Sequence, residues 1–445
     1  MLKLAAPLVV AELGWMGMGI VDTMMVGRVS AEAMGAVSLG SVLFYAVAIF
    51  GSGLMLGLDT LVSQAYGAGR RMDCHRALLS AVYLSLPLTP LLMFLIWCWE
   101  PLLVRFGINP SVLRQTLPYL RAIMWSTLPL LLYFAFRRYL QAMNYTTPIM
   151  FALVTANLVN VAGNWILVYG HFGAPAMGAE GSGWATCISR VYMTAVLVAY
   201  TFHNAFVNRT GLLHAPLMPD LTRIRALINL GFPAAMQLTI EVGVFAAATA
   251  LIGTLDPLSL AAHQIAINTA SLTYMVPLGI SAAAAVRVGQ ALGRGDIHAA
   301  SRAGWTAMGL GAAFMASAGV LMITFPAYVA RAFTTDRAVI RTAVSLLAVA
   351  AAFQLFDGIQ TVATGALRGT GDTRTPMICH LLGYWVIGLP LGYVLCFFVG
   401  WGAVGLWIGL CIALILIGLV LLLAWTRKVH ALAGFRAMVG QGVKP

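Results

Sequence analysis

Long apolar runs separated by short polar connections repeat along the whole chain. Each run has roughly 20 residues, enough for a helix to cross a hydrocarbon core about 30 Å thick. The runs are continuous rather than alternating, which excludes the roughly ten-residue strands of a membrane β-barrel. The pattern therefore predicts an all-α polytopic membrane protein with twelve transmembrane helices, at residues 4–27, 34–60, 77–99, 117–140, 147–169, 181–202, 226–253, 259–285, 302–325, 342–367, 376–399 and 402–425.

The composition supports this assignment. Of the 445 residues, 61% are hydrophobic and 9% are charged, whereas about 25% of a soluble globular chain is charged. The net charge of +12 does not indicate a nucleic-acid partner, because the basic residues lie in the short segments between apolar runs. The first run is followed by many more and has no small-residue cleavage site, so we interpret it as a spanning helix rather than a signal peptide.

The six cysteines are scattered and show neither CxxC nor Cys/His spacing. They therefore indicate neither a disulfide framework nor a zinc site, and we expect no cofactor. The residues concerned are Cys74, Cys98, Cys187, Cys379, Cys396 and Cys411.

The distribution of Lys and Arg predicts the orientation. Alternate connections, counted together with both termini, contain 18 basic residues against 7 in the other set. The richer set includes Arg70, Arg71 and Arg76, the pair Arg137 and Arg138, and Lys444 near the C-terminus. Because cytoplasmic connections carry the excess of positive charge, both termini are predicted to be cytoplasmic.

The two halves of the chain resemble each other at an offset near 226 residues. The segment Val62–Gly69 matches Val288–Gly295 at Gln, Ala and both Gly positions, and Pro7 matches Pro233. Six helices per half make the repeat parallel, so we predict two lobes related by a pseudo-two-fold along the membrane normal, with a central cavity between them. The predicted divisions are an N-terminal lobe 1–202, a cytoplasmic linker 203–225, a C-terminal lobe 226–426 and a cytoplasmic tail 427–445.

Two acids in the second half are candidates for a cation site. An acid in hydrocarbon costs about 2.5–3.5 kcal/mol even on lenient scales, yet Glu241 and Asp357 fall deep inside predicted spans. Carboxylates with amide and hydroxyl oxygens suit a sodium ion, and a buried carboxyl can equally hold a proton. The alternative is a pair of neutral acids that hydrogen-bond for helix packing. Polar residues at helical spacing accompany them: Gln237, Gln264, Asn268, Tyr274, Gln354 and Thr361.

A second polar cluster is predicted in the first half. Asp22 lies near the end of the first helix, and Asn160 and Asn164 share one face of the fifth. We interpret these three residues as a group that changes with protonation, the alternative being a structural hydrogen-bond network. Glu12 is expected near the inner half of a cavity and Asp59 at the cytoplasmic interface, with no role assigned to either.

Three stretches, DTMMVGR from Asp22, GLDTLVSQAYGAG from Gly57 and QLFDGIQTVATGALRGTGD from Gln354, resemble motifs of the multidrug and toxic compound extrusion (MATE) family, NorM-like branch. The resemblance covers essentially the whole chain. It implies an antiporter that exports cationic, amphipathic compounds in exchange for Na⁺ or H⁺. By motif match it makes Glu241 and Asp357 the cation-site acids of the second lobe.

The same resemblance makes Asp22 the acid of the first lobe, with Asn160 and Asn164 beside it. Asp336 falls where some family members carry another functional acid. The chain departs from the pattern at Phe353, where relatives can have a Tyr, and at Glu12, where relatives commonly have a neutral amide nearby.

These observations predict a drug:cation antiporter of the bacterial inner membrane that works by alternating access, as a monomer surrounded by lipid. A flippase for lipid-linked saccharides is the alternative transporter, but it requires a more cationic cavity than Arg137, Arg138 and Arg190 provide. An enzyme requires a His/Asp or Cys/His constellation within the spans, where His263 and His380 stand alone in the sequence. We therefore expect no enzymatic activity.

Overall fold

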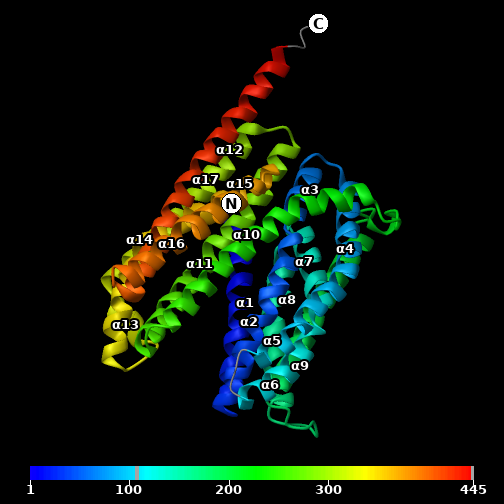
Figure 1. Cartoon of the computed structure of the whole chain (residues 1–445). Coiled ribbons are helices and arrows are strands. Elements are labelled where there is room, and N and C mark those ends of the chain that lie inside the picture. Colours follow the sequence, from blue (N-terminus) through cyan, green and yellow to red (C-terminus); the bar gives the residue numbers. More distant parts are fainter. Residues whose placement is uncertain (106–109, 442–445) are drawn as a thin grey trace. The chain divides into compact units, whose positions relative to one another are not determined.

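The computed structural model describes residues 1–105 and 110–441, which contain helices and connections and no strand (Figure 1). The first half comprises α1 (Leu2–Gly27), α2 (Ala31–Leu54), α3 (Gly57–Gly67), α4 (Arg71–Trp97), α5 (Trp99–Arg105), α6 (Pro110–Met124), α7 (Thr127–Ala142), α8 (Thr147–Leu167) and α9 (Ala179–Val207). After the 3₁₀ turn η1 (Leu212–His214), the second half comprises α10 (Leu221–Gly253), α11 (Pro257–Gly293), α12 (Ile297–Thr324), α13 (Pro326–Arg331), α14 (Arg337–Thr370), α15 (Arg374–His380), the π-helical η2 (Leu381–Gly388), α16 (Leu389–Tyr393), the π-helical η3 (Val394–Phe398) and α17 (Gly402–Gln441).

Eleven helices among the described residues are long and apolar enough to cross a membrane, and α6 with α7 makes a twelfth if this bent pair is one span. The pair bends by 47°. Pro129 explains the position of the bend, because it has no N–H to donate to the carbonyl of Trp125 one turn earlier. The all-α fold with twelve predicted spans is confirmed.

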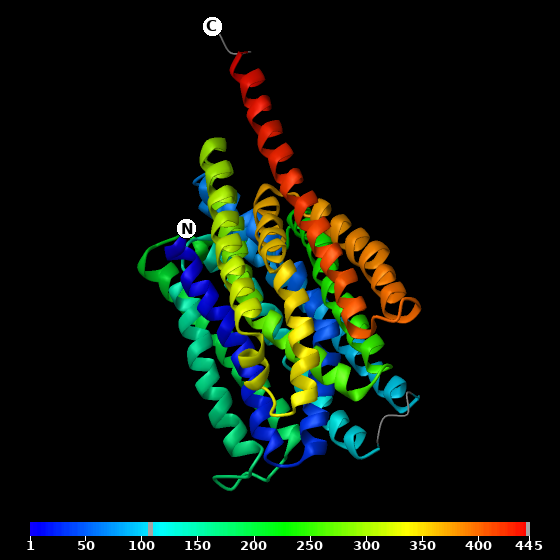
Figure 2. The same cartoon turned by 90° about the vertical axis from the view of Figure 1, so that its left-hand side faces the viewer.

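Several helices run beyond their predicted limits. Because α9 continues to Val207 and α10 begins at Leu221, the predicted linker 203–225 is non-helical or 3₁₀ only over residues 208–220. The predicted tail 427–445 is helical as far as Gln441, and α17 extends past the helices around it (Figures 1 and 2). Residues 442–445, including Lys444, lie outside the described residues.

The structure divides into two compact units whose boundaries lie inside helices. The N-terminal unit is Val10–Ala235, and the C-terminal unit is Met1–Val9 together with the chain from Met236 onward. The boundaries therefore fall within α1 and α10, a few residues after Pro7 and Pro233, rather than in the linker. The linker itself belongs to the N-terminal unit.

In the C-terminal unit, α14 is the central helix and packs against α11, α12 and α17. Small residues let α11 and α14 approach closely: a Cβ on Gly365 would lie 2.2 Å from the carbonyl oxygen of Ser281. The Ser281 hydroxyl donates to the Thr361 carbonyl at 2.7 Å. Small residues at such interfaces drive helix packing in membranes, and this contact places polar side chains of the two helices side by side.

In the N-terminal unit, α8 packs against α9, while α6 and α7 also contact α9. Side-chain hydrogen bonds connect α1 to this group. Asn157 of α8 donates to the Gly14 carbonyl at 3.1 Å, and the Tyr169 hydroxyl donates to the Met25 carbonyl at 2.7 Å. Asn157 on α8 and Tyr169 just after its end thus fix the position of α1.

The repeated sequence motifs form helix ends. Gly69 and Gly295 both have positive φ, 75° and 73°, and follow α3 and α11. The next amide in each case donates five residues back, Arg70 to Ala65 and Asp296 to Ala291, both at 2.9 Å. This is the Schellman ending, in which glycine takes the left-handed position at little cost.

Candidate functional site

Glu241 lies in the C-terminal unit, 8% exposed, with partners from three segments. Its Oε2 accepts from Gln237 Nε2 at 3.2 Å, one turn earlier on α10. Its Oε1 accepts from the Tyr274 hydroxyl of α11 at 3.3 Å. His380 Nε2, at the end of α15, is 3.7 Å from Oε2. The structure thus brings the predicted residues Gln237 and Tyr274 to Glu241 and adds His380.

Asp357 of α14 is 7% exposed and close enough to Glu241 for their charges to interact. Its Oδ1 accepts from Gln360 Nε2 at 3.0 Å, and the same amide donates to the Tyr384 hydroxyl at 3.0 Å. The two predicted acids therefore share one polar region, with Gln360 and Tyr384 as additional members.

A cavity of about 20 Å³ adjoins Glu241. This volume suffices for about one water molecule, which needs roughly 10–15 Å³. Polar side chains from α10, α11, α14 and α15 line it, including one arginine: Gln237, Glu241, Tyr274, Ser281, Thr361, Thr364, Arg368 and His380. The acid is consequently enclosed by protein but retains space for a water or a small ion.

Three predicted supporting residues have other partners. Gln264 is exposed and donates to Asn268 of the same helix at 3.2 Å. Gln354 is fully buried and donates to the Thr273 hydroxyl at 2.9 Å and to the Met322 sulfur at 3.3 Å. None of these hydrogen bonds reaches Glu241 or Asp357, so the polar helix faces that suggested these residues do not all converge on the two acids.

The predicted trio of the first half comes together in the N-terminal unit. Asn164 Nδ2 donates to Asp22 Oδ1 at 2.6 Å and to Asn160 Oδ1 at 3.2 Å. Thr186 of α9 donates to the other carboxylate oxygen at 2.8 Å. Asp22 is 6% exposed and both asparagines are fully buried. The arrangement holds the carboxylate between two neutral donors.

Two further acids pair with arginines inside the N-terminal unit. Glu12 of α1 forms a buried ion pair with Arg137 of α7, and Asp59 Oδ2 of α3 is 3.5 Å from Arg138 Nη1. The Asp59 side chain is fully buried within the protein. Arg137 and Arg138 lie within α7, 1% and 9% exposed, rather than in a connection as predicted.

Two other residues have specific local environments. Asp336 accepts from the Ala338 amide at 2.7 Å as the N-cap of α14. His263 does not stand alone: it bonds the Thr249 hydroxyl at 2.8 Å and accepts from Trp407 Nε1 at 2.9 Å. These contacts give Asp336 and His263 structural explanations.

Among the site residues, Thr186, His380, Gln360 and Tyr384 were missed in the sequence. Gln360 had a usable signal, because it lies one turn after Asp357 on the same helix. Thr186 and His380 had none, since each is more than 100 residues from its acid and lies on another helix. Their proximity arises only from packing.

The fold and the buried acids define a multi-pass membrane protein of the kind represented by secondary transporters, in which ionisable residues within the spans mark the functional site. The family model MatE matches residues 7–166 and again residues 233–394. The two matches begin 226 residues apart, which confirms the internal repeat. The chain belongs to the MatE family.

The relatives match over nearly the full length. The probable multidrug resistance protein NorM of Mesorhizobium japonicum is 38% identical over 434 residues, covering 96% of this chain and 93% of the relative. The multidrug resistance protein NorM of Aliivibrio fischeri is 34% identical, covering 89% and 86%. Two solved structures share the fold: MATE in the bent conformation, with TM-score 0.88, 19% identity and coverage of 98% and 96%, and the eukaryotic MATE transporter AtDTX14, with 0.85, 22% and coverage of 97% and 97%.

Proposed function

We propose that this chain is a secondary multidrug antiporter that exports cationic, amphipathic organic compounds in exchange for Na⁺ or H⁺. The observation that carries the proposal is the buried pair Glu241 and Asp357, with amide and hydroxyl groups around it, in a chain whose relatives are named multidrug resistance proteins. Two carboxyls in one low-dielectric region favour uptake of a cation, because bound positive charge relieves their burial and mutual repulsion.

Coupling requires that the cation bind one conformation more tightly than the other. A ligand with equal affinity for both states shifts nothing. In the proposed cycle, Na⁺ or H⁺ enters Glu241 and Asp357 from outside, favours the inward-facing state and displaces the drug outward. Asp22, held by Asn164 and Thr186, acts in the other half as a second group whose charge changes during the cycle.

The setting of the proposed antiport is a bacterial inner membrane, with both termini in the cytoplasm and the monomer as the working unit. The excess of Lys and Arg in alternate connections supports this orientation. Arg137, Arg138 and Arg368 are buried in helices and leave this count, yet the remaining residues of the first set still outnumber those of the second.

A flippase for a lipid-linked saccharide is disfavoured by the surroundings of the arginines. Arg137 pairs with Glu12, and Arg138 lies beside Asp59. Arg190 donates to the hydroxyls of Ser126 at 2.6 Å and Tyr45 at 3.0 Å. These guanidinium groups already have partners within their own unit, so they offer little to a pyrophosphate.

The test is drug resistance in a pump-deficient bacterial strain that expresses the chain. Glu241→Gln and Asp357→Asn are each expected to lower resistance to ethidium or norfloxacin markedly, because each removes a carboxylate through which the cation distinguishes the two conformations. Typical coupling free energies correspond to roughly 5–150-fold in binding affinity. Asp256→Asn is the matched control, because Asp256 is an exposed acid that caps α11 and Asn caps equally well. Resistance equal to the parent in both site variants, at equal amounts in the membrane, contradicts the proposal.

The coupling ion is identified in membrane vesicles loaded with ethidium. Efflux driven by a sodium gradient is compared with efflux driven by a pH gradient, each with the other gradient collapsed. Either dependence, lost in Glu241→Gln, supports antiport. Efflux that needs neither gradient contradicts it.

A further inference from the structure

A groove of about 440 Å³ lies within the N-terminal unit, between α4 and the connection that precedes α10. It is distinct from both acid clusters, and its volume is within the range of about 300–1,000 Å³ typical of small-molecule sites. Its lining combines Arg76, the acid Asp220 and the hydroxyl of Ser80 with side chains that are largely apolar, among them Leu79, Tyr83, Met218 and Leu221. The Asp220 carboxylate is paired with Arg223, 3.1 Å away.

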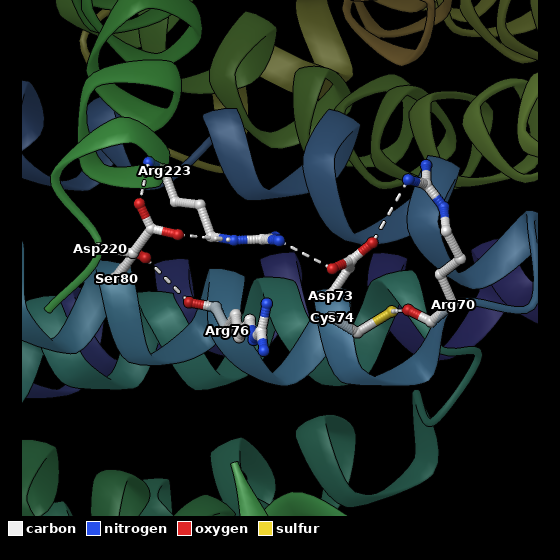
Figure 3. Close-up of polar contacts among 7 residues, drawn as sticks. All are labelled: Arg70, Asp73, Cys74, Arg76, Ser80, Asp220 and Arg223. Carbon is white, nitrogen blue, oxygen red and sulfur yellow. Dashed lines mark hydrogen bonds and ion pairs between the residues drawn. The ribbon is translucent and has the colours of Figure 1, made fainter. Parts of the chain in front are cut away.

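The connection and the first turn of α10 are held to α4 by hydrogen bonds and ion pairs. Arg223 Nη2 is 2.8 Å from Asp73 Oδ1, and its Nε is 3.1 Å from Asp220 Oδ2 (Figure 3). Farther along, the Tyr83 hydroxyl donates to the Leu217 carbonyl. His75 Nε2 bonds the Thr210 carbonyl at 2.9 Å. These contacts join the two walls at several points, so the groove is a built feature of the unit.

Arg76 is the charge in this region that has no acidic partner among the described residues. Asp73 forms ion pairs with both Arg70 and Arg223, and Asp220 forms an ion pair with Arg223 (Figure 3). The Nε of Arg76 is buried and has no hydrogen-bond partner in the described part of the chain. A guanidinium in this situation is stabilised by an anion that accepts its N–H groups.

The connection and the start of α10 also expose large apolar side chains. Leu217, Met218 and Leu221 are 73%, 86% and 77% exposed, and Leu213 is 56% exposed. Such a cluster is unfavourable in water but favourable at the boundary between lipid headgroups and acyl chains. It indicates that this side of the groove faces the membrane surface.

Along α4, a charged side chain is followed by apolar ones, as the charged headgroup of a phospholipid is followed by its acyl chains. Arg76, Leu79 and Tyr83 lie on one face at helical spacing, over about 10 Å. The cation is nearer the end of the span, and the apolar side chains follow toward its middle. A headgroup phosphate at Arg76 would therefore direct its acyl chains along Leu79, Tyr83 and Met218.

We propose that this groove binds an anionic phospholipid, with Arg76 pairing the phosphate and the apolar lining holding the acyl chains. Basic pockets at the cytoplasmic ends of spans are suited to such headgroups. The site is independent of the proposed antiport, and it would fasten the connection before α10 to the bilayer.

The experiment measures lipid retention by the purified full-length chain with native mass spectrometry, using dioleoyl-phosphatidylglycerol and dioleoyl-phosphatidylcholine as probes. The parent is expected to retain the anionic lipid preferentially. Arg76→Gln should weaken its retention roughly tenfold or more, as expected for loss of a charge-assisted contact. Arg71→Gln is the matched control, because Arg71 is exposed on the same helix outside the groove. Salt screens this exposed charge, so the control should change lipid retention by no more than about twofold.

Arg76→Lys keeps the charge and should keep most of the binding, which separates loss of the site from loss of folding. Equal retention of both lipids by the parent overturns the proposal, as do equal effects of Arg76→Gln and Arg71→Gln. Displacement of the lipid by inorganic phosphate at equal concentration also overturns it, because the groove would then be a site for a free anion.

Discussion

The buried pair of Glu12 and Arg137 places two full charges inside the N-terminal unit, with side chains 9% and 1% exposed. Burying each charge alone costs several kcal/mol, and their attraction offsets this cost only while both are present. Tyr133 lies beside the guanidinium, with its ring centroid 6.0 Å away. The pair connects α1 to α7, so its loss affects packing as well as charge balance.

We therefore expect Arg137→Met to lower the stability of the folded chain by about 3–5 kcal/mol, because Glu12 is left buried without a counter-charge. The double variant Glu12→Leu with Arg137→Met should regain most of that loss. The measurement is the midpoint of thermal unfolding in detergent, followed by fluorescence-detected gel filtration. Arg121→Met is the control: it removes a surface pair with Glu100 in which the arginine is 61% exposed, and such pairs contribute little. A double variant as unstable as Arg137→Met would rule out this account.

For single residues, a functional role is predicted best from the sequence where the side chain is energetically unfavourable in its surroundings. Glu241, Asp357 and Asp22 were found because an acid in an apolar run needs a compensating environment. The partners of these acids were predictable only within one helix, as for Gln237. Arg137 was assigned to a connection because a charge near the end of a run cannot be distinguished, by sequence alone, from one that folds inward onto an acid 125 residues away.

At the scale of the helix, the repeated glycines end spans and prepare the next ones. After Gly295, Asp296 caps α12 and accepts from the Ala299 amide at 2.9 Å. This backbone hydrogen bond holds the pKa of the Asp296 carboxyl below its usual value. A positive φ at the glycine turns the chain so that one helix can stop and the next begin within three residues.

Gly295→Ala should accordingly destabilise the chain by about 1–2 kcal/mol, since an L-residue pays this amount in the left-handed region. No atom lies within 4 Å of the added Cβ, so the cost is backbone strain rather than a clash. Gly309→Ala is the control: it has equal space around it but lies inside α12, where Ala is favoured over Gly. A lowered unfolding midpoint for Gly295→Ala with an unchanged or raised midpoint for Gly309→Ala is expected. Equal midpoints would exclude strain at this turn.

Element existence was predictable from the sequence, whereas helix interruptions were not. The bend between α6 and α7 follows from Pro129, but proline also lies inside uninterrupted candidate spans, such as Pro277 in α11. The π-helical η2 and η3 occur in an apolar run with no local signal. A helix stays continuous or is interrupted at such a position according to whether neighbouring helices compensate for the lost backbone hydrogen bond. That compensation depends on packing.

For the whole molecule, the repeat is visible in the contacts as well as in the sequence. A Cβ on Gly53 would lie 2.5 Å from Ala235, within the N-terminal unit, and one on Gly279 would lie 2.6 Å from Val9, within the C-terminal unit. These contacts correspond at the offset of 226 residues. Each unit therefore packs the beginning of the first helix of the other half, and the chain passes between units inside α1 and α10.

The orientation of this repeat in the membrane is a prediction that labelling can test. One additional cysteine is introduced in each variant, at Phe172, which is 86% exposed between α8 and α9, or at Arg209, between α9 and α10. In right-side-out vesicles, a membrane-impermeant maleimide should react with Phe172→Cys and spare Arg209→Cys, and inside-out vesicles should give the reverse. The parent chain, with four buried and two partly buried cysteines, measures background labelling.

The labelling result bears on the direction of transport, because the order of the spans determines both which side Arg209 faces and from which side α10 enters the membrane. Arg209 precedes α10, so a cytoplasmic Arg209 means that α10 enters from inside, with Glu241 about 30 Å along the helix from Leu221. The acid then lies nearer the outer end of that helix, where a cation descending its gradient arrives first. Labelling of Arg209→Cys from outside would reverse this order and remove the reason for expecting inward cation flow to drive export.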